Sequence, residues 1–304
     1  MTQLLNALPG ALAQGLIWGV MAIGVYITYK VLDIADLTVD GSLCTGAAVC
    51  TMLLLGGQSP WLALLCAVLA GVLAGAVTGL LHVGLGIPPI LAGILTQMVL
   101  WSVNLKLLGK ANQALPARTT PVLLSQMDVG GALPVLLGFC VVLVALLVLF
   151  FGTELGCALR ATGCNPVMSR AQGVNTGLMK IIGLALSNGV VALSGALLCQ
   201  YQGYTDVNMG RGAVVIGLAA VVIGQAVLGR RGGRMAVQLG GVILGAVIYY
   251  IVYQVIIFAG FDTDLLKMFS AVVVAVFLGA PHVKAQLKAH SRSKKGDSGH
   301  AENE

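Results

Sequence analysis

The chain has 304 residues, of which 58% are hydrophobic and only 9% are charged. Because soluble domains carry about 25% charged residues, this composition excludes a soluble globular protein and indicates an integral membrane protein. The formal net charge of +6 reflects basic residues at segment ends and in the tail Lys284–Lys295. This distribution fits contact with membrane lipid and argues against nucleic acid as a partner.

Hydropathy predicts an all-α fold with about nine transmembrane helices, since roughly 20 apolar residues are needed to cross a bilayer. The expected spans are roughly residues 11–29, 39–55, 61–83, 88–108, 132–152, 178–199, 213–229, 236–259 and 265–281. They form one polytopic transmembrane domain over 1–283. The polar tail 284–304 is expected to be disordered in the cytoplasm.

The first irregular stretch, Asp33–Ser42, places three carboxylates close to membrane depth. Ionisable residues are costly there and are functional candidates by default. Asp36 and Asp40 could line a path through the membrane or cap the start of a helix, and the sequence favours neither interpretation.

Among the polar residues within predicted spans, we single out Gln97, Asn104 and Asn188. Such groups more often hold helices together, through hydrogen bonds worth about 0.6 kcal/mol each, than contact a ligand. Both interpretations remain open for these residues.

The longest polar interruption is Thr153–Lys180, which carries Arg160, Arg170 and Lys180 between two apolar segments. The positive-inside bias places this stretch in the cytoplasm. With an odd number of spans, the amino terminus and the loop 109–131 are then expected outside.

A short surface helix is predicted within the cytoplasmic loop 153–177. Asn165 and Pro166 are typical of a helix cap and a first helical position, and Gly173 or Gly177 would end the helix. A short helix on the surface of a multispan protein predicts a docking point for a soluble partner, in preference to a merely structural loop.

The second irregular stretch, Tyr204–Gly212, enters an apolar run without room for another full span. Irregular backbone at membrane depth persists only where protein or a water-filled cavity satisfies its polar groups, so we interpret both stretches as re-entrant. Asp36-Leu-Thr and Asp206-Val-Asn share a loose pattern that indicates an internal repeat, as in many transporters. Asn208 and Arg211 could satisfy a re-entrant turn or contact a substrate.

A resemblance to a known family lies in residues 206–224, which read D-V-N-M-G-R-G-A-V-V-I-G-L-A-A-V-V-I-G, and in R-R-G-G-R and G-G-V-I-L-G within 230–245. These runs resemble the permease subunits of bacterial ABC importers of the branched-chain amino acid and ribose type. Residues 159–175 resemble that family's cytoplasmic coupling loop, and 15–30 resemble its opening span.

Within this group the chain is most similar to the tryptophan/tyrosine transport permeases. The similarity lies in I-T-Y-K-V-L-D-I-A-D-L-T-V-D-G-S (27–42) and G-I-L-T-Q-M-V-L-W-S-V-N-L (93–105). Where the branched-chain type has Asn-x-Ala-His-Gly, this chain has Asp36-Leu-Thr-Val-Asp40-Gly41. That departure disfavours a branched-chain substrate, and the resemblance favours an aromatic amino acid.

The resemblance implies a dimer, most simply of two identical chains, around a central path in the bacterial inner membrane. Each copy would contact one cytoplasmic ATP-binding subunit, and an external binding protein would deliver the solute. The chain has no Gly-x-x-x-x-Gly-Lys-Ser/Thr loop, so it is predicted not to be an enzyme, and ATP-Mg would be bound by the partner subunit. No metal or other cofactor is predicted, since the seven cysteines lack metal-binding spacing.

Two sets of residues are therefore expected to carry function. The set expected to couple to the ATPase is Arg160, Gly163, Cys164, Asn165, Pro166, Arg170 and Gly173. The set expected to border the translocation path or its gate is Asp36, Asp40, Ser42, Gln97, Asn104, Asn188, Asn208, Gly210 and Gly212.

The alternative is a secondary transporter or channel that works without an ATPase subunit. Such a protein would need a coupling carboxylate or cation site at the midplane, whereas the charged residues here gather at segment boundaries. An intramembrane enzyme would need a nucleophile with a base, and no such constellation lies near the bilayer centre.

Overall fold

The computed structural model describes residues 2–116, 120, 122–228 and 234–258, together with the isolated positions 268, 272 and 275. The elements, in chain order, are α1 (Thr2–Tyr26), the π-helical turn η1 (Ile27–Val31), α2 (Thr38–Leu55), α3 (Pro60–Gly84), α4 (Pro89–Leu108), β1 (Asn112–Ala114), α5 (Val129–Gly152), α6 (Glu154–Cys164), α7 (Pro166–Ala171), α8 (Thr176–Gln202), β2 (Tyr204–Asp206), α9 (Ala213–Leu228) and α10 (Met235–Phe258).

Seven helical segments in the described ranges are long and apolar enough to cross a membrane. They are Leu8–Val31, Thr38–Leu55, Pro60–Gly84, Pro89–Leu108, Val129–Gly152, Thr176–Gln202 and Met235–Phe258. These segments match seven of the predicted spans and confirm the all-α membrane class.

Of the two remaining predicted spans, one is shorter than expected and the other stays a prediction. Span 213–229 corresponds to α9, a helix of 16 residues. At 1.5 Å per residue it is about 24 Å long, less than the roughly 30 Å of hydrocarbon in a bilayer. Apart from the isolated positions 268, 272 and 275, span 265–281 lies outside the described residues, as does the tail 284–304, so the count among the described residues is seven.

Small residues set the spacing of the central helices. The buried helix α8 packs against α1, α2 and α3. A Cβ on Gly46 of α2 would overlap the Ala192 carbonyl oxygen, and a Cβ on Gly75 of α3 would overlap the Leu184 carbonyl oxygen. Glycine at these two positions lets backbones touch, which is how helices associate in lipid.

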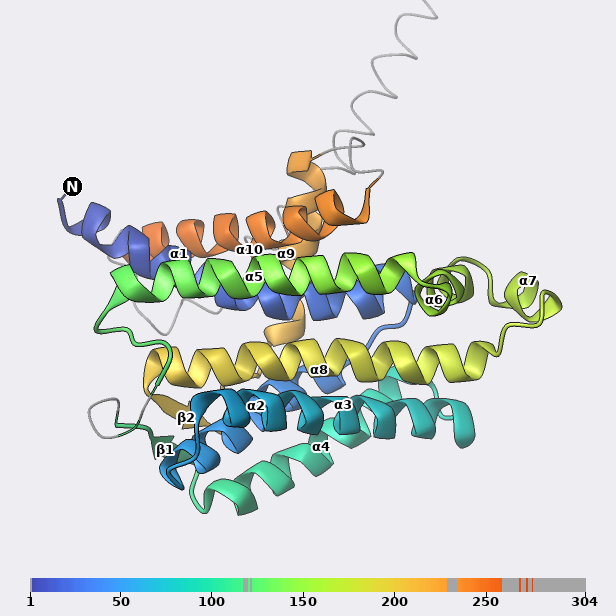
Figure 1. Ribbon diagram of the computed structural model, residues 1–304, viewed down its shortest axis with the longest axis horizontal. Coiled ribbons are helices and arrows are strands. Elements are labelled where there is room, and N and C mark those ends of the chain that lie inside the picture. The colour runs from blue at the N-terminus through green and yellow to red at the C-terminus, as the bar shows by residue number, and fades with distance from the viewer. Residues whose placement is uncertain are drawn as a thin grey trace, which may run out of the picture.

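Polar elements lie at the two ends of the bundle. Helices α6 and α7 lie at one end, and the two-stranded sheet of β1 and β2 lies at the other (Figure 1). The strands are antiparallel and pair Asn112 with Asp206 and Ala114 with Tyr204. The loop that follows α4 is therefore tied to the second irregular stretch, and it lies at the end opposite the predicted coupling loop, as expected.

Candidate functional site

Helix α7 begins where the sequence predicts. The Asn165 side-chain oxygen accepts hydrogen bonds from the backbone N–H groups of Val167 and Met168, at 3.1 and 3.0 Å. Pro166 occupies the first helical position. Asparagine as cap with proline next to it satisfies the free N–H groups of the first turn, so the predicted start is confirmed.

The end of α7 distinguishes between the two predicted stop residues. Gly173 has φ of +85°, the left-handed conformation that glycine adopts readily, and it follows the last turn. Gly177 instead lies in the first turn of α8, which Asn175 caps. The sequence also missed α6, an 11-residue helix between the α5 span and α7.

The exposed surface of α7 carries two large apolar side chains. Val167 is 75% exposed and Met168 is 59% exposed, while Cys164 is exposed beside them. The two predicted arginines are held within the loop: Arg160 donates to the Phe151 carbonyl at 3.0 Å, and Arg170 donates to the Thr176 hydroxyl at 2.7 Å. A fixed helix with an exposed apolar tip is typical of a docking surface.

Helix α6 lies directly on the end of α1. A Cβ on Gly163 would overlap the Val31 carbonyl oxygen in η1 and would lie 3.0 Å from the Leu32 Cα. Leu32 in turn packs against Gly183 of α8 so closely that a Cβ there would overlap its side chain. The predicted coupling loop therefore touches the chain at the point where the first irregular stretch begins.

The first irregular stretch is fixed by a buried hydrogen-bond network. Asp36 is 5% exposed; its Oδ1 accepts from the Thr38 N–H at 2.9 Å and its Oδ2 from the Asn188 amide at 2.7 Å. The Asn188 side-chain oxygen accepts from the Ser42 hydroxyl at 2.6 Å. Three predicted path residues are thus brought together, as a bonded cluster between α2 and α8. Their role in gating stays a prediction.

Asp40 joins the two irregular stretches. Its carboxylate accepts hydrogen bonds from the backbone N–H groups of Gly212 and Val214, each at 3.0 Å, and so caps the start of α9 from α2. Gly210 packs against the Asp40 carbonyl oxygen, and its N–H donates to the Cys44 sulfur at 3.1 Å. Of the two interpretations of Asp40, capping is therefore observed.

The two stretches share a local geometry. The Asp36 carboxylate accepts from the N–H of the residue two positions on, Thr38, and the Asp206 carboxylate accepts likewise from Asn208 at 2.6 Å. This is the Asx turn, in which a short carboxylate replaces a backbone acceptor. The loose sequence repeat thus corresponds to the same turn before α2 and shortly before α9.

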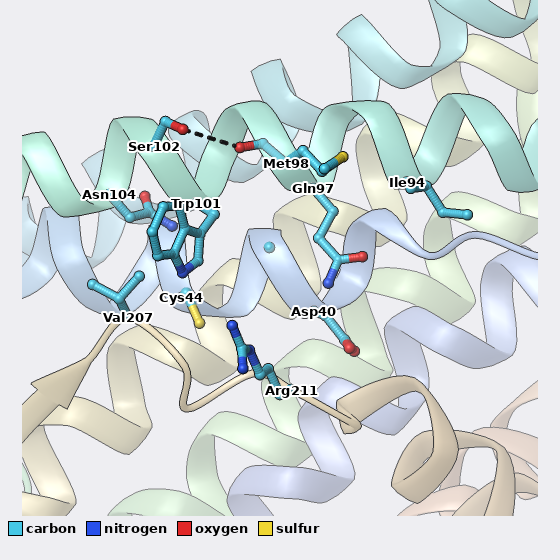
Figure 2. Close-up of a pocket in the computed structure, with 11 residues that line it drawn as sticks. Asp40, Cys44, Ile94, Gln97, Met98, Trp101, Ser102, Asn104, Val207 and Arg211 are labelled. Atoms are coloured by element: carbon cyan, nitrogen blue, oxygen red, sulfur yellow. Dashed lines mark hydrogen bonds between the residues drawn. The ribbon is translucent and has the colours of Figure 1, made fainter. Parts of the chain in front are cut away.

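A cavity of about 650 Å³ lies where α2, α4 and the second stretch meet (Figure 2). Its lining residues are Asp40, Gly41, Cys44, Ile94, Gln97, Met98, Trp101, Ser102, Asn104, Val207 and Arg211. Figure 2 shows Gln97 and Trp101 extending from α4 toward the side of the cavity that holds Asp40 and Arg211.

The cavity contains only part of the predicted path set. Asp40, Gln97 and Asn104 line it, whereas Asp36 and Asn188 belong to the buried network. Asn208, Gly210 and Gly212 lie beside it: the Asn208 side chain accepts from the Trp101 indole N–H at 3.4 Å, and the two glycines contact Asp40 as described.

Sequence reasoning missed Trp101 as a lining residue. The signal was the spacing of Ile94, Gln97, Met98, Trp101 and Asn104 at positions i, i+3, i+4, i+7 and i+10, which places them on one helix face.

The polar groups of the cavity are not all satisfied from within. Asn104 is 1% exposed, and neither its amide nitrogen nor its amide oxygen has a hydrogen-bond partner. The Arg211 guanidinium forms no ion pair or side-chain hydrogen bond with any described residue. Burying an unpaired amide costs free energy, so the cavity retains capacity for polar contacts. No group of three or more His, Cys, Asp or Glu in the described ranges could hold a metal ion.

Comparison with known proteins places this chain in a family. Residues 8–280 match the family described as the permease component of branched-chain amino acid transport systems. The chain belongs to this permease family. Over 287 residues the permease is 38% identical to the tyrosine transport system permease protein of Clostridioides difficile (strain R20291), covering 93% of this chain and 94% of the relative.

Two further relatives are more distant. The permease is 33% identical over 279 residues to an uncharacterized protein of Rickettsia prowazekii (strain Madrid E), covering 91% and 98% of the two chains. It is 29% identical over 239 residues to the autoinducer 2 import system permease protein LsrC of Escherichia coli (strain K12 / DH10B), covering 75% and 66%. No solved structure matches the permease. The resemblance noted in the sequence is confirmed, and the relatives with a stated role are transport permeases rather than enzymes.

Proposed function

We propose that this permease is the membrane subunit of an ATP-driven importer in the bacterial inner membrane. It would work as a homodimer with two cytoplasmic ATP-binding subunits, which bind ATP-Mg, and an external binding protein that delivers the solute. The solute would be a small amphipathic metabolite, with an aromatic amino acid favoured. The name of the Clostridioides difficile relative and the Trp101-lined cavity support this choice.

The observation that carries the proposal is the contact of α6 with η1. The neighbouring helix α7 is capped at Asn165 and exposes Val167 and Met168, so a soluble subunit can bind to it. Because Gly163 lies against Val31 without an intervening side chain, a displacement of α6 is transmitted to the first irregular stretch. Packed elements move as rigid bodies, which a flexible loop would not do.

From η1 onward, the displacement would be transmitted through hydrogen bonds. The stretch after Leu32 leads to Asp36, which is bonded to α8 through Asn188, and to Asp40, which is bonded to the start of α9. Closure of the ATP-binding subunits would therefore shift α2 and α9 together and change access to the cavity between α2, α4 and residues 207–211. In this scheme both irregular stretches are re-entrant parts of the gate.

Energy dependence tests the class of transporter. In membrane vesicles that contain the permease with its ATP-binding subunits and are supplied with the external binding protein, uptake of radiolabelled tyrosine should require ATP and be unaffected by a protonophore. Uptake that follows the proton gradient and continues without the ATP-binding subunits would favour a secondary transporter and overturn the proposal.

Cys164 is a native reporter of docking. In a Cys157→Ser background, Cys164 should react with a membrane-impermeant maleimide only from the cytoplasmic side, and much more slowly once the ATP-binding subunit is bound. The matched control retains Cys157, also exposed, and carries Cys164→Ser. Equal labelling of Cys164 in the presence and absence of an assembled partner would remove α7 as the docking helix.

A further inference from the structure

We propose that the cavity between α2, α4 and residues 207–211 recognises the transported solute directly, as a zwitterionic aromatic amino acid. This inference rests on the proposed function and adds to it a specificity site in the membrane subunit. The solute carboxylate pairs with Arg211, its ammonium group faces Asp40, and its ring packs on the α4 face that carries Trp101.

Opposite charges in one cavity are the first argument. Arg211 and Asp40 both line the cavity, and no ion pair joins them. Asp40 is held in place by the backbone N–H groups of Gly212, Ala213 and Val214, and its carboxylate as a whole retains capacity for a further hydrogen bond. A zwitterion placed between the two side chains would neutralise both charges.

The apolar part of the cavity is the second argument. Ile94, Met98 and Trp101 line one side, and the Trp101 indole N–H donates to Asn208, which restrains the indole ring. Aromatic rings and thioethers pack favourably against an aromatic ligand. A cavity of about 650 Å³ is within the usual range for small-ligand sites.

The unpaired amide is the third argument. Asn104 is almost fully buried, lines the cavity, and has neither its donor nor its acceptor satisfied. Figure 2 shows it beside Trp101 on the same helix. Such a group is costly unless a bound molecule completes its hydrogen bonds, and the polar atoms of the amino acid, with its hydration water, supply them.

The test uses the full-length permease in lipid nanodiscs, without the binding protein or ATP-binding subunits. Binding of L-tyrosine and L-tryptophan is measured by calorimetry and compared with that of tyramine, which lacks the carboxylate, and of leucine, which lacks the ring. The intact aromatic amino acids should bind more tightly than either analogue, by about tenfold for loss of the charged pairing.

Variants locate the site. Arg211→Gln should weaken tyrosine binding about tenfold while leaving tyramine binding unchanged, and Trp101→Leu should weaken both about fivefold. Asn104→Leu, which removes the unpaired amide at similar volume, should weaken tyrosine binding without lowering the thermal unfolding temperature. Arg234→Gln and Trp61→Leu are matched controls, because both residues are exposed and neither lines the cavity.

The outcomes separate this inference from the proposed function. If tyrosine fails to bind, or binds equally to wild type and Arg211→Gln, the inference is overturned even where uptake requires ATP. Displacement of tyrosine by anionic phospholipid at bilayer concentrations would identify a lipid site and also overturn it. Binding that follows the predicted pattern in a permease whose uptake ignores ATP would support the cavity and refute the ATP-driven mechanism.

Discussion

In the first irregular stretch Asp36 is buried with both carboxylate oxygens bonded, whereas in the second Arg211 is exposed to a cavity and bonds to no described side chain. Both stretches nevertheless use the same Asx turn, at Asp36 and at Asp206. The same Asx turn therefore lies next to a fully bonded, buried carboxylate before α2 and next to an available arginine, Arg211, before α9. The difference comes from the partner: α8 supplies Asn188 to the first stretch, while α4 opposes the second across the cavity.

The largest effect is expected where the two stretches meet. Gly210→Val places a branched side chain where the Asp40 carbonyl oxygen lies, so the stretches must separate. Overpacking of this kind costs about 1–3 kcal/mol or more. ATP-dependent uptake should fall to background while the protein still inserts in the membrane.

The matched control for that variant is Gly138→Val in α5, since a Cβ on Gly138 would meet nothing within 4 Å. It should transport normally. Normal uptake by Gly210→Val would show that close contact between the two stretches is dispensable.

Replacing the aspartates of the two turns should lower the free energy of unfolding by different amounts. Asp36→Ala leaves the buried Asn188 amide with only the Leu184 carbonyl as an acceptor and should lower the free energy of unfolding by about 2–3 kcal/mol. Asp206→Ala removes a similar turn at a half-buried site and should cost about 1 kcal/mol. Denaturant unfolding in detergent measures both, and equal losses would mean that burial does not distinguish the turns.

The backbone at the start of α9 should be sensitive to a single methyl group. Gly212 has φ of +87° with open space around its Cα, so Gly212→Ala costs about 1–2 kcal/mol through the left-handed conformation alone. Gly240→Ala, inside α10 and equally open, should instead stabilise the protein by about 0.5–1 kcal/mol. Thermal unfolding of the pair measures the difference, and a shift in the same direction for both would contradict the backbone explanation.

The smallest effect is expected at the edge of the buried network. Ser42→Ala removes the hydrogen bond to the Asn188 oxygen but leaves Asp36 fully bonded, so the loss should be about 1 kcal/mol. Uptake should remain near wild type if the network is mainly structural. A loss of uptake without a loss of stability would instead support a direct role of Ser42 in the gate.

Several features of the permease were predictable because their causes are local. Span positions follow from the apolar composition of each segment, and seven of them match. The start of α7 follows from Asn165 and Pro166, whose capping bonds reach only two or three residues along the chain. The repeat of Asp36 and Asp206 was visible for the same reason, because an Asx turn is completed within three residues.

Other features depend on residues far apart in sequence, and the sequence by itself left them open. Asn188 meets Asp36 across 152 positions, and Asp40 meets Gly212 across 172. Helix packing determines three further features. Asp40 acts as a cap, three segments meet around one cavity, and Trp101 lines that cavity. Hydropathy specifies that a segment enters the membrane, but the partner of a polar side chain there is set by close helix contacts, which only the tertiary structure determines.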